Sequence, residues 1–189
     1  VIEGNMGDGF PENYKTTLRS ELVALAKKAA SGDANFDDWM RVGVIKKVFR
    51  DFSGARDAWK YAGAVYTMNP LPFYNLGDLY GWYIKDFPKS EKNFQHAISL
   101  DPKKSNFYAS LADLYRLFYA AKKDLVIPTI ESGLKELPND ANLLLYLGSY
   151  YRDDAKNNAK AIFYYEKVLT QDPTNSPLRQ EIDRLKSLP

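Results

Sequence analysis

Apolar side chains recur every three or four residues along most of the chain, which is the spacing that places them on one face of an α-helix. Residues 1–10 contain three glycines and show no such period. The first apolar series then comprises Tyr14, Leu18, Leu22, Leu25 and Ala29. Proline is tolerated in the first turn of a helix, and glycine often ends one in the left-handed conformation. We therefore predict an irregular lead-in over 1–10 and an N-terminal helix over 11–32, from Pro11 to Gly32.

The helical spacing continues through the rest of the chain. The next apolar series, from Phe36 to Phe52, predicts a helix over about 35–52 that Gly54 closes. Another helix is expected over about 55–68, just before Asn69-Pro70. No segment alternates apolar and polar residues in the way that a half-buried strand does. The pattern therefore predicts an all-α protein.

Gly77 lies in the middle of a predicted helix, although glycine there is about 1 kcal/mol less favourable than alanine. Its surroundings are repeated along the chain. Leu76-Gly77 followed by Tyr80 returns as Leu111-Ala112 followed by Tyr115 and as Leu147-Gly148 followed by Tyr151, with spacings of 35 and then 36 residues. A small residue at this point allows two helices to pack closely. We therefore expect Gly77 to pack against a second helix near Ser90 and Phe94, and a larger residue at this position to destabilise the fold.

A second predicted helix follows each of these Leu-Gly or Leu-Ala steps. Four of its positions also recur, separated each time by four, three and five residues. Its four positions are Ser90, Phe94, Ala97 and Pro102; Val126, Ile130, Gly133 and Pro138; Ala161, Tyr165, Val168 and Pro173; and, upstream, Ala58, Ala62, Val65 and Pro70. The closing proline cannot continue a helix. The sequence therefore predicts one helical hairpin copied four times.

This hairpin pattern resembles the tetratricopeptide repeat, which has a period of 34 residues with small, aromatic and closing proline positions. The resemblance runs from Phe36 to Pro173 and implies a right-handed α-solenoid of antiparallel hairpins. We expect repeats over 35–70, 71–102, 105–138 and 141–173 in a single domain spanning 11–189. The units run slightly long, and the first fits only with three residues inserted before Ala58. A stack of hairpins leaves apolar ends, so the helices at 11–32 and 176–188 are expected to cap it.

Two prolines inside the predicted second helices bear on where those helices begin. Pro88 falls at the start of its helix, where proline is tolerated. Pro128 follows Asp124, a plausible capping residue, by four positions. It fits the first turn only if that helix starts late, and the alternative is a kink.

Composition excludes several functions. The chain has 26 basic and 24 acidic residues, so it lacks the basic excess of a nucleic-acid binder. It has no cysteine and a single histidine, His96, for which an exposed surface position is the simpler interpretation. No apolar run is long enough to span a membrane. We therefore expect no catalysis, no metal, no cofactor and no membrane insertion by this segment, in a cytoplasmic or extracytoplasmic setting.

The resemblance also implies where a partner would bind, because the first helices of successive tetratricopeptide repeats line a concave groove. The residues at those positions are Met40, Val44 and Lys47, then Tyr74 and Asp78, then Ala109, Asp113 and Arg116, and finally Leu145, Ser149 and Arg152. They mix apolar side chains with carboxylates and guanidinium groups. Such a mixture favours an extended peptide or a helix as the ligand.

The Lys, Asn and Arg clamp that co-chaperone members of the family use to grip a chaperone tail is absent from these positions. The sequence therefore favours a protein-binding module or scaffold whose partner it does not identify. The alternative is an adaptor or sensor segment of a larger, membrane-anchored protein whose activity lies outside this chain.

Overall fold

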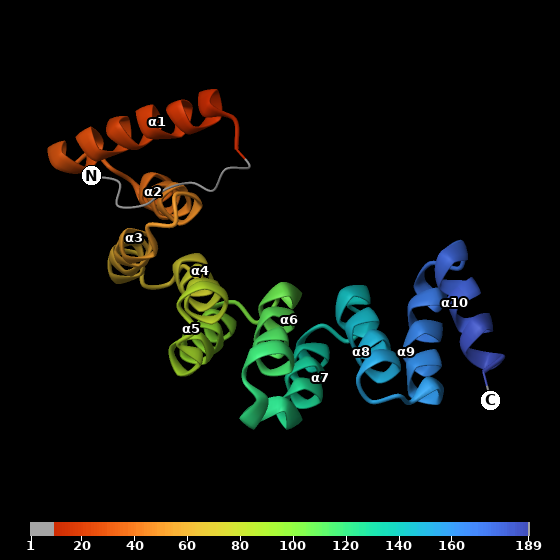
Figure 1. Cartoon of the computed structure of the whole chain (residues 1–189). Helices are drawn as coiled ribbons and strands as arrows, with labels where there is room; N and C mark the ends of the chain where they lie inside the picture. Colours follow the sequence, from red (N-terminus) through yellow and green to blue (C-terminus); the bar gives the residue numbers. More distant parts are fainter. Residues whose placement is uncertain (1–9, 189) are drawn as a thin grey trace. The chain divides into compact units, whose positions relative to one another are not determined.

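The computed structural model describes residues 10–188, and within that range all regular structure is helical (Figure 1). The helices are α1 (Glu12–Ser31), α2 (Phe36–Val48), α3 (Phe52–Val65), α4 (Leu71–Asp78), α5 (Phe87–Leu100), α6 (Ser105–Asp113), α7 (Val126–Glu136), α8 (Ala141–Asp153), α9 (Asn158–Gln171) and α10 (Ser176–Lys186). The lead-in predicted over 1–10 lies, but for its last residue, outside the described residues.

Contacts divide the chain into two compact units, which meet in sequence between Leu100 and Asp101. In the first unit α2 packs on α3 and α4 packs on α5. In the second unit α6 packs on α7, α8 packs on α9, and α10 packs on α9. Each unit is thus built from helical hairpins joined by short connections, with an additional helix at the outer end.

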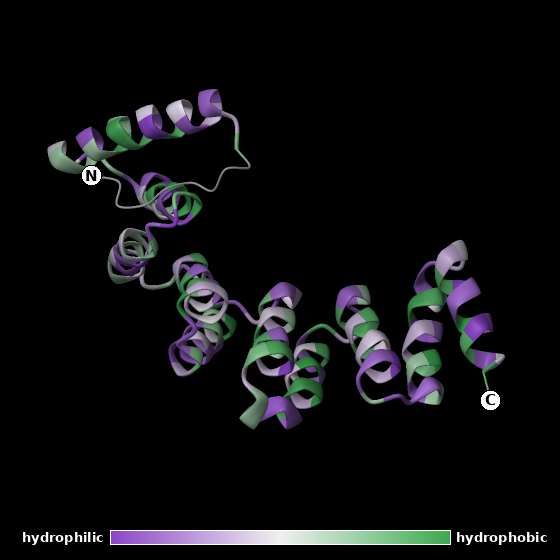
Figure 2. Cartoon of the chain, viewed as in Figure 1, coloured by the Kyte–Doolittle hydropathy of each residue, from purple (hydrophilic) through white to green (hydrophobic). Residues whose placement is uncertain are grey.

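The core of the first unit consists of two clusters. The helix α1 contributes Leu18, Leu22 and Leu25, which pack against buried side chains of α2 and α3. Of its other predicted apolar positions, Tyr14 is exposed and Ala29 is half-buried. The second cluster surrounds Trp59 and joins α3 to α4. Green stripes along single faces of the helices show the same amphipathic pattern (Figure 2). The predicted left-handed end of α1 is confirmed at Gly32, with φ of 82°.

Glycine brings the two helices of a hairpin together, as the repeat predicts. A Cβ atom at Gly77 would lie 2.6 Å from Cδ1 of Phe94, so the ring of Phe94 occupies the space of a side chain. The buried hydroxyl of Ser90 also donates a hydrogen bond to the Gly77 carbonyl oxygen at 2.7 Å. Gly148 meets the ring of Tyr165 in the same way, at 2.2 Å from its added Cβ. The predicted contact of Gly77 with Ser90 and Phe94 is confirmed.

In the first hairpin a glycine also lies against an aromatic ring, but the ring comes from a different position of the second helix. A Cβ at Gly43 would lie 2.2 Å from Nε1 of Trp59, and Trp59 donates a hydrogen bond from that nitrogen to the Met40 carbonyl oxygen at 3.2 Å. The ring therefore comes from the residue after Ala58, whereas in the α4–α5 and α8–α9 hairpins it comes from Phe94 and Tyr165, four residues after Ser90 and Ala161. Val65, the third position of the predicted set, is 53% exposed because α3 ends there.

The boundary predicted between the second and third helices is wrong. The helix α2 ends at Val48, and Arg50 then has φ of 62°, which breaks the helix. The next helix begins at Phe52, and Asp51 caps it by accepting a hydrogen bond from the Gly54 amide. Gly54 thus lies in the first turn of α3 and does not close α2. The apolar spacing runs through this break because both helices bury their adjoining ends.

The extra residues of two hairpins are absorbed by wider helical turns. The chain continues from α4 into a π-helical segment over Leu79–Ile84, and from α6 into another over Leu114–Phe118. A π-helical turn holds one more residue than an α-helical turn. Before α7 a short 3₁₀ segment spans Ala120–Leu125, and α7 starts at Val126. Pro128 therefore lies in a first turn, so the late start predicted as one alternative is correct.

Candidate functional site

Three of the five predicted groove positions of the first unit pack against aromatic rings of neighbouring elements. Met40 and Val44 of α2 pack against the cluster around Trp59. The ring of Tyr74, on α4, lies 5.7 Å from the ring of Phe94 on α5, measured between centres. These side chains therefore contribute to packing within and between hairpins.

The other two positions of the first unit form an ion pair. The Lys47 ammonium lies 2.9 Å from a carboxylate oxygen of Asp78, which joins α2 to α4. The same ammonium lies 5.2 Å from the ring centre of Tyr83. Lys47 and Asp78 therefore hold successive hairpins together.

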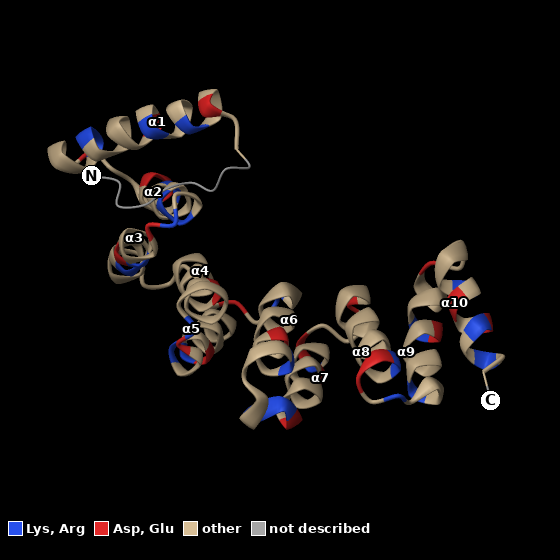
Figure 3. Cartoon of the chain, viewed as in Figure 1, with Lys and Arg blue, Asp and Glu red and all other residues tan. Residues whose placement is uncertain are grey.

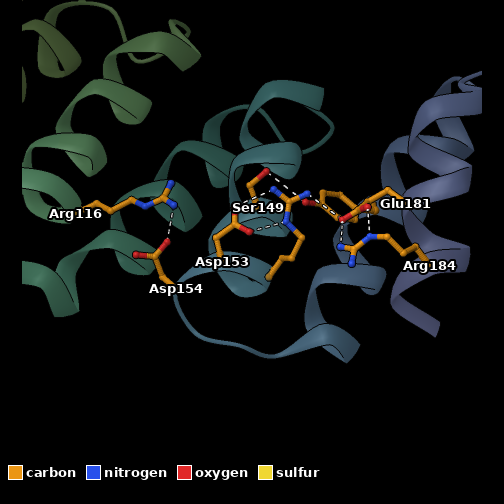
Figure 4. A network of polar contacts seen from close by, with 8 residues as sticks. Arg116, Ser149, Asp153, Asp154, Glu181 and Arg184 are labelled. Carbon is orange, nitrogen blue, oxygen red and sulfur yellow. Dashed lines mark hydrogen bonds and ion pairs between the residues drawn. The ribbon is translucent and has the colours of Figure 1, made fainter. Parts of the chain in front are cut away.

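In the second unit Asp113 and Arg116 both reach the next hairpin, while Ala109, on α6, is half-buried. The Tyr146 hydroxyl of α8 donates a hydrogen bond to Asp113 at 2.6 Å. The Arg116 guanidinium lies 2.5 Å from a carboxylate oxygen of Asp154, just beyond α8 (Figure 4). The positions that the family pattern assigns to a groove thus also link the α6–α7 hairpin to α8.

Burial perturbs the titration of this polar pair. It raises the pKa of the Asp113 carboxyl, against the effect of the hydrogen bond from Tyr146 and the charge of Arg116. Burial and the hydrogen bond to Asp113 together raise the pKa of the Tyr146 hydroxyl well above its ordinary value. Tyr146 therefore keeps its proton at neutral pH and is the donor of this hydrogen bond.

The three predicted positions on α8 border an open hollow of about 390 Å³. Leu145, Ser149 and Arg152 form one side of it, and Leu178 and Glu181 of α10 form the other. The Ser149 hydroxyl lies 3.3 Å from that of Tyr165, and both residues border the hollow. The C-terminal helix α10 therefore faces α8 where a further first helix would stand. The hollow combines apolar walls with hydroxyl, guanidinium and carboxylate groups.

Ion pairs hold the two sides of this hollow together (Figure 4). Arg152 lies 3.0 Å from Glu181, and it also forms an ion pair with Asp153 at 2.6 Å. Glu181 in turn pairs with Arg184 at 2.7 Å. Hydrogen bonds from Arg184 and then Arg152 lower the pKa of Glu181 to about 2. The network is therefore fully charged at neutral pH, and its Arg152–Glu181 pair links α8 to α10.

The helices carry charges of both signs interspersed along them (Figure 3). Among residues 10–188, no group of three or more His, Asp or Glu side chains is placed to hold a metal ion. Within the same range, no helix combines the length and apolar character that crossing a membrane requires. His96 lies on the exposed side of α5, with its ring edge-on to Phe73 at 4.2 Å between centres.

Sequence reasoning missed the partners of the predicted positions. Tyr146, Asp154 and Glu181 each complete a contact that begins at a predicted residue. The signal for Glu181 is present in the sequence, because Leu178 and Glu181 are three residues apart and share a face of α10. No comparable signal exists for Asp154, since its distance from Arg116 depends on how the loop after α8 folds.

Two segments, residues 72–104 and 141–175, match the sequence model of the tetratricopeptide repeat. They correspond to the hairpins α4–α5 and α8–α9 together with the turns that follow. Among curated proteins, no sequence matches the chain.

Solved structures share the fold at low sequence identity. MamA is 18% identical, with a TM-score of 0.66 over 91% of this chain and 98% of MamA. TTC0263, a thermophilic protein with these repeats from Thermus thermophilus, is 13% identical, with a TM-score of 0.61 over 93% of this chain and 97% of its own. YrrB, a repeat protein described as having an unusual peptide-binding site, is 18% identical, with a TM-score of 0.59 over 91% and 88%. The chain therefore contains tetratricopeptide repeats at residues 72–104 and 141–175, and all regular structure among residues 10–188 is helical.

Proposed function

We propose that the chain is a protein-interaction scaffold without catalysis of its own, and that it binds a peptide in the hollow between α8 and α10. One observation carries the proposal. Leu145, Ser149 and Arg152, three positions that the family pattern assigns to ligand contact, border a single open hollow of about 390 Å³. Repeat stacks use such surfaces for extended ligands, and YrrB is described as having a peptide-binding site.

The chemistry of the hollow defines the ligand. Leu145 and Leu178 offer apolar walls for one aliphatic or aromatic side chain. The Ser149 hydroxyl and the guanidinium of Arg152 add polar groups beside them. Because Arg152 is already paired with Asp153 and Glu181, it attracts an additional carboxylate only weakly. The hollow therefore favours a peptide with an apolar anchor and uncharged polar neighbours.

The experiment selects peptides from a random displayed library against the purified chain and measures their affinity by fluorescence anisotropy. We expect Leu145→Ser to weaken the enriched peptides about tenfold, which is a loss of about 1.4 kcal/mol. Leu117→Ser is the matched control, because Leu117 is 59% exposed in the same unit and does not border the hollow. Equal affinity of the selected peptides for both variants and the unaltered chain would refute the site.

A further inference from the structure

A second hollow lies in the first unit, between the second helices of adjacent hairpins. It has a volume of about 460 Å³ and is bordered by one face of α3 and one face of α5. Phe73, Leu76 and Tyr80 give it an apolar lining, and Gly63 and Ala64 border it on the α3 side. The volume is within the range of small-ligand sites and accommodates one large side chain with its neighbours. None of the groove positions predicted from the sequence borders it.

The rim of this hollow is positively charged. Lys60 of α3 stands on one side, and Lys89 and Lys92 of α5 stand on the other, while no carboxylate is among the bordering residues. Lys89 is paired with Asp86 at 2.5 Å. In contrast, within residues 10–188 neither Lys60 nor Lys92 forms an ion pair with a carboxylate. The ammonium groups of these two lysines are therefore available to a ligand.

On the α3 side the hollow is bordered by two small residues. Gly63 and Ala64 directly follow Ala62, the position that matches Phe94 in α5. The residues at the place of Gly63 in the other second helices are Gln95, Glu131 and Glu166. In the second unit, Tyr164 of α9 stacks on Tyr151 of α8 with ring centres 5.6 Å apart. The α3 side of the hollow is therefore bordered by small residues where the other second helices have longer polar side chains.

We propose that the hollow between α3 and α5 binds an acidic segment of a partner protein. An apolar side chain of that segment lies on Phe73 and Tyr80, and flanking carboxylates meet Lys60 and Lys92. Charge complementarity selects this ligand, because the rim has three lysines and no bordering acid. The apolar lining distinguishes it from a polyanion, which needs phosphate contacts along a basic stripe and no apolar anchor. None of the residues that border this hollow borders the one between α8 and α10.

The probe is a fluorescein-labelled peptide of twelve residues, with two central leucines flanked by glutamates, titrated with the full chain at low salt. We expect binding that weakens at high salt, where charges are screened. Lys60→Glu combined with Lys92→Glu should weaken it at least tenfold. Ala64→Trp, which adds a ring at an exposed position bordering the hollow, should weaken it without changing the net charge.

The matched control is Lys27→Glu combined with Lys135→Glu, which changes the net charge equally at exposed positions of α1 and α7. Its affinity should stay within twofold of the unaltered chain. A peptide with lysines in place of the glutamates should not bind, and one with serines in place of the leucines should bind more weakly. Circular dichroism confirms that each variant is folded.

Three results would overturn the proposal. The first is that the acidic peptide does not bind the unaltered chain. The second is that the Lys60 and Lys92 double variant and its control bind equally well. The third is that an oligouridylate competes with the peptide and that the same double variant no longer binds the oligouridylate. That result would assign the hollow to nucleic acid.

Discussion

At the scale of single residues, close approach of two helices depends on one missing side chain. The ring of Phe94 fills the space that a Cβ of Gly77 would occupy, at 2.6 Å. Glycine is about 1 kcal/mol less favourable than alanine in a helix interior. The buried ring of Phe94 offsets this loss, because burying a phenylalanine stabilises by about 1.5–3 kcal/mol. Because the backbone of Gly77 is helical, glycine is not needed there for its conformational freedom. It is needed because its missing side chain makes room for Phe94.

Replacing Gly77 with leucine tests this packing. The new side chain must displace Phe94, so we expect Gly77→Leu to lower the free energy of unfolding by about 1–3 kcal/mol. Chemical denaturation followed by circular dichroism gives the value. Gln95→Leu adds the same side chain at an exposed position of α5 and should change stability by less than about 0.5 kcal/mol. An unchanged denaturation midpoint for Gly77→Leu would contradict the packing.

Two serines on α5 form hydrogen bonds of the same length, one buried and one exposed, so they allow the effect of burial on stability to be measured. Ser90 donates to the Gly77 carbonyl oxygen and Ser99 to the His96 carbonyl oxygen, both at 2.7 Å, but only Ser90 is buried. Ser90→Ala should therefore lower the free energy of unfolding by about 1 kcal/mol. Ser99→Ala should have almost no effect, because water replaces its bond. If urea denaturation gave equal losses of unfolding free energy for the two variants, the buried hydrogen bond between α5 and α4 would contribute no more than the exposed one.

The hydrogen bond from Tyr146 to Asp113 leads to a pH-dependent prediction. Tyr146→Phe removes the donor from the half-buried Asp113 carboxyl, and hydrogen bonds to charged groups contribute about 1.5–3 kcal/mol. Burial raises the pKa of Asp113 in the folded chain, so the carboxyl becomes neutral there as the pH falls. A neutral carboxyl needs this donor less. The stability difference between Tyr146→Phe and the unaltered chain should therefore be largest at pH 7 and shrink in acid, as measured by urea denaturation across pH.

A matched control uses a tyrosine hydroxyl without a carboxylate partner. The hydroxyl of Tyr108 donates to the Pro102 carbonyl oxygen at 3.2 Å. Tyr108→Phe should therefore cost stability by an amount that does not shrink as Asp113 is protonated. A difference for Tyr146→Phe that is constant from pH 7 to acid would show that protonation of Asp113 does not weaken the contribution of this hydrogen bond.

Sequence reasoning identified the glycine contacts but not all of their partners. The repeat predicted that Gly77 meets Phe94, because both belong to patterns that recur at fixed offsets. It did not predict that Gly43 meets Trp59, because the break at Arg50 shifts the register of α3 relative to α2. Pairs such as Lys47 with Asp78 were also beyond prediction. They depend on how far one hairpin is rotated against the next, which no local pattern encodes.

At the scale of elements, the helices α4 and α6 show how a repeat accommodates additional residues. Each continues into a π-helical segment, which widens the last turn and keeps the following helix in position. The sequence revealed that the hairpins were long, but not whether the loop or the helix absorbed the excess. Both outcomes preserve the apolar spacing on either side, so periodicity does not separate them.

The attachment of α10 leads to a prediction in acid. Ion pairs with Arg184 and Arg152 lower the pKa of Glu181 to about 2 from an ordinary value of 4.5. The stabilisation by Glu181 is therefore complete above about pH 4.5 and is lost as the pH falls towards 2. Glu181→Gln should be less stable than the unaltered chain at pH 7, and this difference should vanish near pH 2. Thermal unfolding across this pH range measures it.

The control for Glu181 is Glu131→Gln, at an exposed position of α7. It removes the same charge from the same unit and should keep the acid-dependent loss of stability seen in the unaltered chain. If Glu181→Gln also keeps the full loss between pH 4.5 and 2, then Glu181 is not the group responsible.

At the scale of the whole molecule, contacts connect elements that are neighbours in the chain. In the second unit α10 packs on α9, and α9 packs on α8. The stability of such an array is close to a sum of repeat and nearest-neighbour contributions. Damage at one end should therefore spread to adjacent helices and fade with distance along the chain, as local unfolding does in other repeat proteins.

A buried charge in α10 tests this locality. Leu185 is 2% exposed and Ile182 is 3% exposed, so Leu185→Asp places an unpaired carboxylate in an apolar site. We expect faster hydrogen exchange in α8, α9 and α10, and unchanged protection in α2 and α3. Gln180→Asp adds the same charge at an exposed position of α10 and should leave exchange unaltered throughout. Uniform loss of protection in both units under Leu185→Asp would mean that the chain unfolds as one cooperative block, because only long-range coupling carries damage from α10 to α2.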